Sequence, residues 1–158
     1  MRPALFSTRR ACHLTTALLL GGLVLTAVPA QAAPVSEAVV GRLADFPEGT
    51  HRVVQANGRE IGVFNIAGRF YGLPNLCPHQ TGPLCQGRIA TGTLKADSDS
   101  DWKPRWVMDG EVIACPWHGL EYHVPTGQCL AHPEITLRRY PVTVRDGDVV
   151  VTVGSTRR

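Results

Sequence analysis

The sequence predicts an all-β domain of antiparallel strands, and three observations indicate it. The 158 residues are enough for one domain but short for two. The 16 glycines and 12 prolines are typical of a chain with many tight turns. After residue 35, short β-branched or alternating apolar runs lie between turn dipeptides, and no long stretch has the apolar spacing of a helix.

Three hairpins are expected in chain order, each around a dipeptide in which asparagine or aspartate precedes glycine. They cover 51–66, 105–115 and 140–153, with turns at Asn57-Gly58, Asp109-Gly110 and Asp146-Gly147. A further short strand, "GRFYGL", follows the first hairpin. We predict that the folded domain covers 35–153 and that 154–158 form a disordered tail.

The first 32 residues have the composition of an export signal. A basic start, "MRPALFSTRR", precedes a 15-residue apolar run at 14–28 and small residues that would allow cleavage after Ala32. The run is too short to span a bilayer well, so no membrane span is expected in the mature chain. We therefore predict an exported protein, periplasmic or extracytoplasmic.

Arg9 and Arg10 suggest a twin-arginine signal, which would export the protein already folded around its cofactor. Cys12 and His13 depart from that motif, because hydrophobic residues normally follow the arginines. The alternative is a misplaced start codon, in which case the protein is cytoplasmic and begins near Val35.

The net charge of +3 arises from the leader. The leader carries three of the 16 basic residues, and the remaining 13 balance 13 acidic residues. A neutral domain has no electrostatic attraction for phosphates, so nucleic acid is not an expected partner.

The polar segment "KADSDSDWKPRW", 95–106, interrupts the strand pattern, and we expect a solvated surface loop there. It contains three aspartates with the spacing that opens an EF-hand calcium loop: Asp97, Asp99 and Asp101. Trp102 and Met108 stand where that loop needs glycine and glutamate, which disfavours calcium binding.

Two mixed pairs of thiol and imidazole side chains carry the chemistry. Cys77 and His79 form a C-x-H pair, and Cys115 and His118 form a C-x-x-H pair near the end of an expected strand. Such a set can hold one tetrahedral zinc ion or two irons of a cluster. Zinc sites usually pair cysteine with cysteine and histidine with histidine, so the mixed pairs favour a site with two metals.

The segments "CPHQTGPLC" and "CPWHGLEYHVPTG" closely resemble the cluster-binding loops of Rieske [2Fe–2S] proteins, especially the ferredoxin-type branch. The resemblance implies a Rieske-like antiparallel β-sandwich with two cluster-binding loops at one tip and one [2Fe–2S] cluster per chain. It implies that Cys77 and Cys115 bind the inner iron, and that His79 and His118 bind the outer iron.

Neutral imidazoles in place of two thiolates raise the reduction potential of such clusters to about −150 to +300 mV. High-potential Rieske proteins add a disulfide between the loops, but Gly82 and Trp117 occupy those positions here, and Leu120 replaces a hydrogen-bonding serine. Tyr122 matches a tyrosine that donates toward the cluster sulfurs. We predict a potential in the lower half of the range, slightly raised by Tyr122, with Trp117 shielding the cluster.

The other cysteines and histidines lack a paired spacing. Cys85 and Cys129 are expected to be unpaired residues of the core or loops, although a disulfide between them remains open. His51, His123 and His132 are interpreted as ordinary surface or strand residues, with a lesser role in tuning the site left open for His123.

The favoured function is a ferredoxin-like electron carrier that serves a redox enzyme, with a reductase or terminal oxidoreductase as partner. No residue is predicted to be catalytic. The alternatives are a tightly bound iron–sulfur subunit of an exported oxidoreductase and a zinc-stabilised β module. The 95–106 segment is longer than the family pattern, and partner binding is a hypothesis for it.

Overall fold

The computed structural model describes residues 35–90 and 92–154, which belong to the second of two separate units of the chain, 1–31 and 32–158. The predicted signal peptide and the tail from residue 155 lie outside the described residues. Within the described part, no helix has both the length and the hydrophobicity to cross a membrane.

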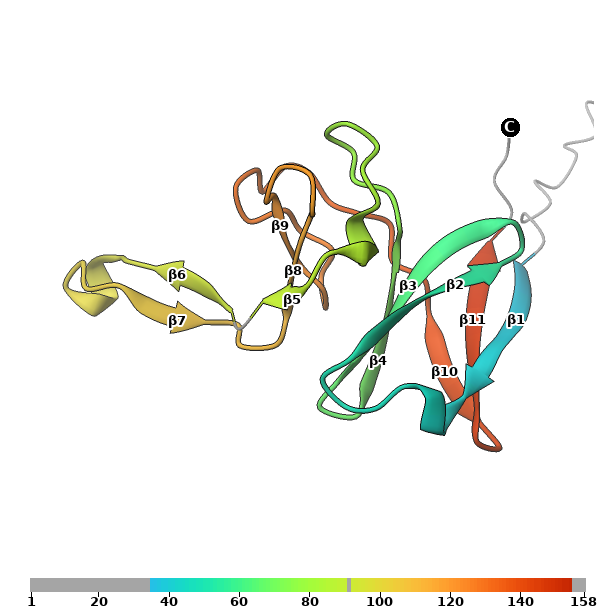
Figure 1. Ribbon diagram of the computed structural model, residues 1–158. Coiled ribbons are helices and arrows are strands. Elements are labelled where there is room, and N and C mark those ends of the chain that lie inside the picture. Colours follow the sequence, from blue (N-terminus) through green and yellow to red (C-terminus); the bar gives the residue numbers. More distant parts are fainter. Residues whose placement is uncertain (1–34, 91, 155–158) are drawn as a thin grey trace, which may run out of the picture. The chain divides into compact units, whose positions relative to one another are not determined.

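Eleven strands form four antiparallel sheets in the described residues (Figure 1). The first sheet contains β1 (Val35–Arg42), β11 (Asp148–Gly154) and β10 (Val142–Arg145), in this order. The second contains β2 (His51–Ala56), β3 (Arg59–Ile66) and β4 (Arg69–Pro74). The third contains β5 (Ile89–Ala90), β8 (Val112–Ala114) and β9 (Glu121–His123). The fourth is a hairpin of β6 (Thr93–Lys95) and β7 (Arg105–Val107). Three short 3₁₀ helices complete the elements: η1 (Leu43–Asp45), η2 (Leu84–Gln86) and η3 (Ser98–Ser100).

Strand β3 is buried on both faces and separates two hydrophobic cores. Ile61 and Val63 pack with the valines of β11, including Val149 and Val151, in the core shared by the first two sheets. Phe64 points to the opposite face, into the core that contains Cys77 and Cys115. Successive side chains of a strand alternate between its faces, so one strand contributes to both cores. Burial of each such valine or isoleucine side chain contributes about 1.5–3 kcal/mol to the stability of the fold.

The hairpins predicted at Asn57-Gly58 and Asp146-Gly147 are confirmed as β2–β3 and β10–β11. The hairpin predicted for 105–115 is wrong. Asp109 and Gly110 do lie in a turn, closed by a hydrogen bond from Glu111 N to Met108 O of 3.0 Å. However, β7 pairs with β6, while β8 pairs with β5 and β9.

The polar segment 95–106, expected to be a loop, begins and ends in strands. Strand β7 pairs with β6 instead of β8, in the register Thr93–Val107, Leu94–Trp106 and Lys95–Arg105. The aspartates lie in the connection, where Asp97 caps η3 by accepting a hydrogen bond from Ser100 N of 3.2 Å. Turn chemistry located the chain reversal at 108–111 correctly, but it did not determine which strand is the partner of β7.

Candidate metal centre

The two cysteine–histidine loops have the same backbone frame. In the first, Cys77 N donates to Gly82 O at 2.8 Å and Thr81 N donates to Cys77 O at 2.9 Å. In the second, Cys115 N donates to Leu120 O at 2.9 Å and Gly119 N donates to Cys115 O at 2.9 Å. In each loop, therefore, the cysteine carbonyl accepts from the residue four positions later and its amide donates to the residue five positions later.

This frame buries the two thiols and exposes the two imidazoles. Cys77 and Cys115 are 1% and 2% exposed, whereas His79 and His118 are exposed at the surface. The loops come from distant parts of the chain but bring the imidazoles together: Nδ1 of His79 lies 3.3 Å from Nδ1 of His118, and the ring centroids are 4.6 Å apart. The two sulfur donors are thus buried, and the two nitrogen donors lie side by side at the surface.

Two residues that sequence reasoning missed hold the first loop in place. Asn75 is buried; its Oδ1 accepts from Cys85 N at 2.7 Å and its Nδ2 donates to Glu60 Oε2 at 2.9 Å. Gly87 follows η2 and lies so close to the end of β8 that a Cβ added there would be 2.0 Å from Ala114 O. Ala114 directly precedes Cys115, so this close approach connects the two loops.

Tyr122, on β9, lies under the loops with its hydroxyl 3.4 Å from Cys77 Sγ. Its side chain is fully buried. Burial, and then the hydrogen bond with the Cys77 thiol, raise the pKa of Tyr122. The phenol is therefore protonated at neutral pH and can donate a hydrogen bond when the sulfur is a thiolate.

Gly82 and Trp117, the two positions expected from sequence to replace a loop disulfide, face each other. A Cβ added at Gly82 would lie 2.9 Å from Cδ2 of the Trp117 indole. The indole therefore covers the backbone of the first loop while remaining 57% exposed. This contact is consistent with a shielding role for Trp117.

A cavity of about 330 Å³ opens beside the two imidazoles. Besides His79 and His118 it is lined by Tyr122, His132 and three apolar side chains: Pro78, Leu120 and Ile135. His132 was interpreted from sequence as an ordinary surface residue, because nothing in the spacing of "AHPE" relates it to the loops. Its Nδ1 lies 3.5 Å from Glu134 Oε1.

The donor set fits a two-iron cluster. Two thiols are soft anionic ligands once deprotonated, and two imidazoles are neutral ligands, which matches the ligation of an asymmetric [2Fe–2S] centre. In the described residues, no three Cys, His, Asp or Glu side chains gather around one point where a single ion could bind them all. Each loop contributes one buried thiol and one exposed imidazole, and the two imidazoles lie close together.

The remaining candidates have other contacts. Both Cys85 and Cys129 are buried free thiols, and burial raises the pKa of Cys85 to about 12. The ring of His51 stacks on Phe64 at 5.0 Å. His123 lies 2.8 Å from Thr126 Oγ1 and 3.1 Å from Glu111 Oε2, so its ring nitrogens are engaged away from the loops.

A comparison with protein families matches residues 36–141 to the Rieske [2Fe–2S] domain. The chain belongs to the Rieske [2Fe–2S] domain family. It is 28% identical over 110 residues to the ferredoxin component of the naphthalene 1,2-dioxygenase/salicylate 5-hydroxylase systems of Ralstonia sp., covering 69% of this chain and 88% of that one. It is 28% identical over 120 residues to the cytochrome b6-f complex iron–sulfur subunit of Chlorobaculum tepidum, covering 75% of this chain but spanning only 55% of that subunit.

Among solved structures, the chain resembles one from a complex of reduced oxygenase and oxidised ferredoxin in carbazole 1,9a-dioxygenase. The TM-score is 0.58 at 26% identity, with 77% of this chain and 97% of that chain covered. These findings confirm the predicted all-β Rieske fold, the single [2Fe–2S] cluster and the relationship to ferredoxin-type carriers. They leave the predicted export untested.

Proposed function

We propose that the protein is a ferredoxin-like electron carrier in which Cys77 and Cys115 bind the inner iron of the cluster and His79 and His118 bind the outer iron. The observation that supports this assignment is the shared backbone frame of the two loops, in which both thiols are buried and both imidazoles are exposed. When bound, a [2Fe–2S] cluster accepts and releases one electron.

Three features of the chain's own residues affect the redox properties of the cluster and the access of a partner to it. Tyr122 donates a hydrogen bond to a ligand sulfur, which favours the more negative, reduced state. Leu120 and Ile135 line the cavity beside the ligands and lower the local polarity. His79 and His118 are exposed, so a partner protein can approach the outer iron directly.

The partner class follows from the relatives. The ferredoxin component from Ralstonia belongs to a dioxygenase system, and the carbazole dioxygenase structure holds a ferredoxin together with an oxygenase. We infer that this protein likewise transfers electrons between a reductase and a larger terminal oxidoreductase.

The alternative, a tightly bound subunit of an exported oxidoreductase, is favoured by the leader sequence. Fractionation of the native cells, with the mature N-terminus sequenced, tests the export.

The ligand assignment is tested by reconstituting the protein with iron and sulfide under anaerobic conditions. Two irons and two sulfides per chain are expected, with the electron paramagnetic resonance signal of a mixed cysteine–histidine cluster after reduction. Replacing Cys115 with serine should abolish that signal, whereas the matched Cys129→Ser variant should retain it. A colourless protein that contains zinc would refute the proposal.

The choice between a mobile carrier and a fixed subunit requires purification from the native organism. A carrier should elute alone and reduce its acceptor in repeated turnovers. A subunit should co-elute with one large protein in a fixed ratio.

A further inference from the structure

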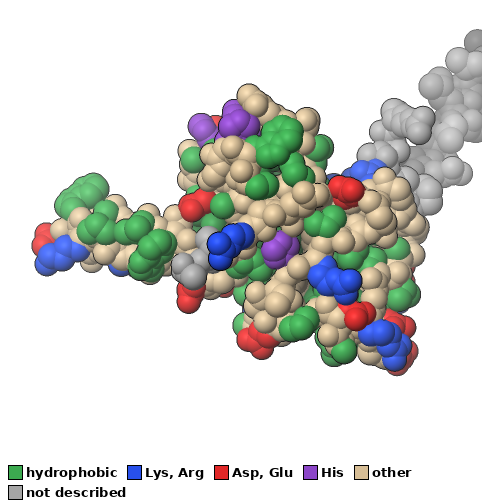
Figure 2. Space-filling model, viewed as in Figure 1, with side chains coloured by type: hydrophobic (Ala, Val, Ile, Leu, Met, Phe, Trp, Pro, Cys, Tyr) green, Lys and Arg blue, Asp and Glu red, His purple; other side chains and the backbone are tan. Residues whose placement is uncertain are grey.

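We propose that the β6–β7 hairpin is a docking surface, and that its tryptophans insert into an apolar pocket of the redox partner protein. This inference rests on the proposed function and specifies where the partner binds. The hairpin patch consists of four exposed apolar side chains: Leu94, Trp102, Trp106 and Met108, which are 56%, 72%, 64% and 38% exposed. Figure 2 shows hydrophobic side chains gathered over this hairpin.

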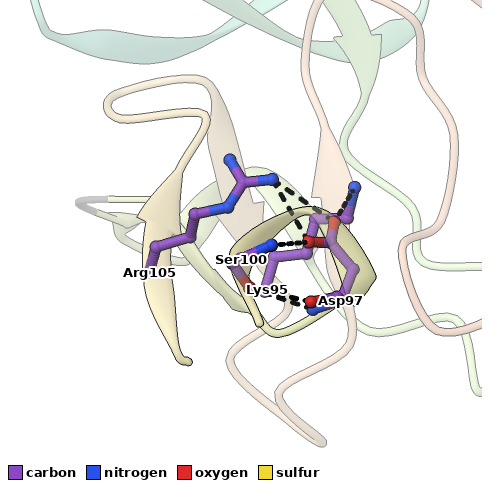
Figure 3. A network of polar contacts seen from close by, with 4 residues as sticks. All are labelled: Lys95, Asp97, Ser100 and Arg105. Atoms are coloured by element: carbon purple, nitrogen blue, oxygen red, sulfur yellow. Dashed lines mark hydrogen bonds and ion pairs between the residues drawn. The ribbon is translucent and has the colours of Figure 1, made fainter. Parts of the chain in front are cut away.

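One apolar pair and one charged pair lie on opposite faces of the hairpin. Leu94 and Trp106 are directly opposite in the β6–β7 register, so their side chains share one face. The neighbouring pair, Lys95 and Arg105, occupies the other face. There both cations bind Asp97, at 2.8 and 3.3 Å (Figure 3). An isolated two-stranded hairpin is marginally stable in water, and this network holds its polar face together.

The tip of the hairpin holds Trp102 in an unusual conformation. Asp101 and Trp102 have φ angles of 51° and 60°, in the left-handed region, which aspartate tolerates but a bulky residue such as tryptophan rarely adopts. A hydrogen bond of 2.9 Å from Trp102 N to Asp97 O fixes the backbone there. Strained residues of this kind are concentrated at functional sites. The indole at this tip is 72% exposed.

The charges favour a protein over a membrane as the occupant. Lys95 and Arg105 are paired with Asp97, and Lys103 Nζ lies 3.5 Å from Asp101 Oδ2. All three cations of the hairpin therefore have acidic partners, whereas binding to anionic lipid uses clusters of unpaired Lys and Arg. A neutral apolar patch is complementary to an uncharged apolar pocket.

The size of the patch favours a transient partner over a second copy of the chain. A stable dimer buries roughly 800 Å² on each subunit, from about 20–30 residues. Four side chains are too few for that, whereas weak electron-transfer complexes have small interfaces. Tryptophan is also enriched among the residues that dominate binding energy at the centres of interfaces.

The base of the hairpin is connected to the cluster loops. Thr93 Oγ1 donates a hydrogen bond of 2.8 Å to Glu121 Oε2 at the start of β9, which follows the second loop directly. Beyond β7 the chain continues through β8 to Cys115. A protein that binds the hairpin patch is therefore held on an element whose base is hydrogen-bonded to β9, the strand that follows the second loop.

Site-specific crosslinking of the full-length protein in its native organism tests the occupant. A photoreactive benzoylphenylalanine replaces Lys103, which is 82% exposed beside the tip and leaves both tryptophans intact. The control places the same group at Val39, an exposed position on β1. We expect one partner protein to be crosslinked from position 103 and none from position 39. After purification, this partner should oxidise the reduced cluster. Crosslinks to lipid, to a second copy or to nothing would overturn the proposal.

The affinity of that acceptor is then measured by stopped-flow oxidation of the reduced holoprotein. The double variant Trp102→Ala, Trp106→Ala should raise the apparent Kd at least tenfold, with the saturating rate and midpoint potential unchanged. Val39→Ala should leave all three unchanged. An unaltered Kd in the double variant would refute the docking surface, whereas failure of the wild-type cluster to form or to transfer electrons would refute the proposed function itself.

Discussion

At the residue scale, the hydroxyl of Tyr122 is positioned to tune the cluster if Cys77 binds it as we propose. It lies 3.4 Å from Cys77 Sγ in a fully buried environment, where a hydrogen bond is stronger than in water. A hydrogen bond to a ligand sulfur is stronger when the cluster carries its extra negative charge, so it stabilises the reduced form. Leu120 occupies the position where the high-potential proteins have a second such donor.

Tyr122→Phe should therefore lower the midpoint potential by tens of millivolts. For one electron, each difference of 1 kcal/mol between the two redox states corresponds to about 40 mV. Protein-film voltammetry measures the shift. Tyr140→Phe is the matched control, because Tyr140 is also buried but belongs to the core between the first two sheets. Equal potentials for Tyr122→Phe and the wild type would show that the hydroxyl has no influence on the cluster.

At the element scale, the position of the two loops depends on how closely η2 approaches β8. A side chain at Gly87 would collide with a backbone oxygen, Ala114 O, which cannot move without moving Cys115. A side chain at Gly82 would instead meet the indole of Trp117, an exposed side chain that can rotate away. An added side chain is therefore tolerated less well at Gly87 than at Gly82.

Gly87→Ala should destabilise the domain by about 1–3 kcal/mol or more, the usual cost of overpacking, and should reduce the iron content. Gly82→Ala should cost less and retain the full cluster. Thermal unfolding and iron analysis of both variants check this contrast. Comparable losses in the two variants would mean that the approach of η2 to β8 is not what sets the loops.

The β6–β7 hairpin depends on the charge of Asp97. The hydrogen bond and charge of Lys95, and then Arg105, lower the pKa of Asp97 to about 2. A lowered pKa contributes stability above the ordinary value near 3.8, and this contribution is lost as the pH falls toward 2. The hairpin should therefore keep its order down to about pH 4 and lose it below.

Asp97→Ala should reproduce that loss at neutral pH. We expect faster amide hydrogen exchange across 93–107 and little change in the melting temperature of the whole domain, because the contacts are at the surface. Asp99→Ala is the control, since Asp99 makes none of the ion pairs of the network. Unchanged exchange in Asp97→Ala would show that strand pairing alone holds the hairpin.

Local patterns predicted those elements that depend on neighbouring residues. Asn57-Gly58 and Asp146-Gly147 determined two hairpins, and the spacing of Cys77 with His79 indicated one half of the candidate site. Contacts between distant segments could not be predicted in this way. The pairing of β7 with β6 and the cavity position of His132 depend on the folded backbone, and no spacing rule encodes them.

The burial of the polar residue Asn75 could not be predicted from the sequence either. Asn75 is 5% exposed, although an asparagine next to proline usually indicates a surface turn. It is buried because Cys85 N and Glu60 satisfy its amide. The partners lie 10 and 15 residues away, so the role of Asn75 follows only from the way β3, β4 and η2 meet.

At the scale of the whole molecule, one buried thiol couples stability to alkaline pH. Cys85 packs against Gly62, where a Cβ would lie 2.4 Å from its Sγ, and burial raises the pKa of Cys85 to about 12 from 9.0. A backbone hydrogen bond from Gly62 opposes this shift. In the unfolded chain the thiol ionises near its ordinary pKa, so the unfolded state binds fewer protons than the folded state above that pH.

The free energy of unfolding should therefore fall as the pH rises from about 9 toward 12. Each pKa unit is worth about 1.4 kcal/mol, so Cys85 alone should account for about 2 kcal/mol between pH 8 and pH 10.5. Urea titrations followed by circular dichroism measure the loss. Cys85→Ala is destabilised at both pH values by the cavity it leaves, but its loss between them should be smaller by that amount. Equal losses in the variant and the wild type would mean that Cys85 does not remain protonated in the folded protein, and that the core between β3 and η2 is open to water.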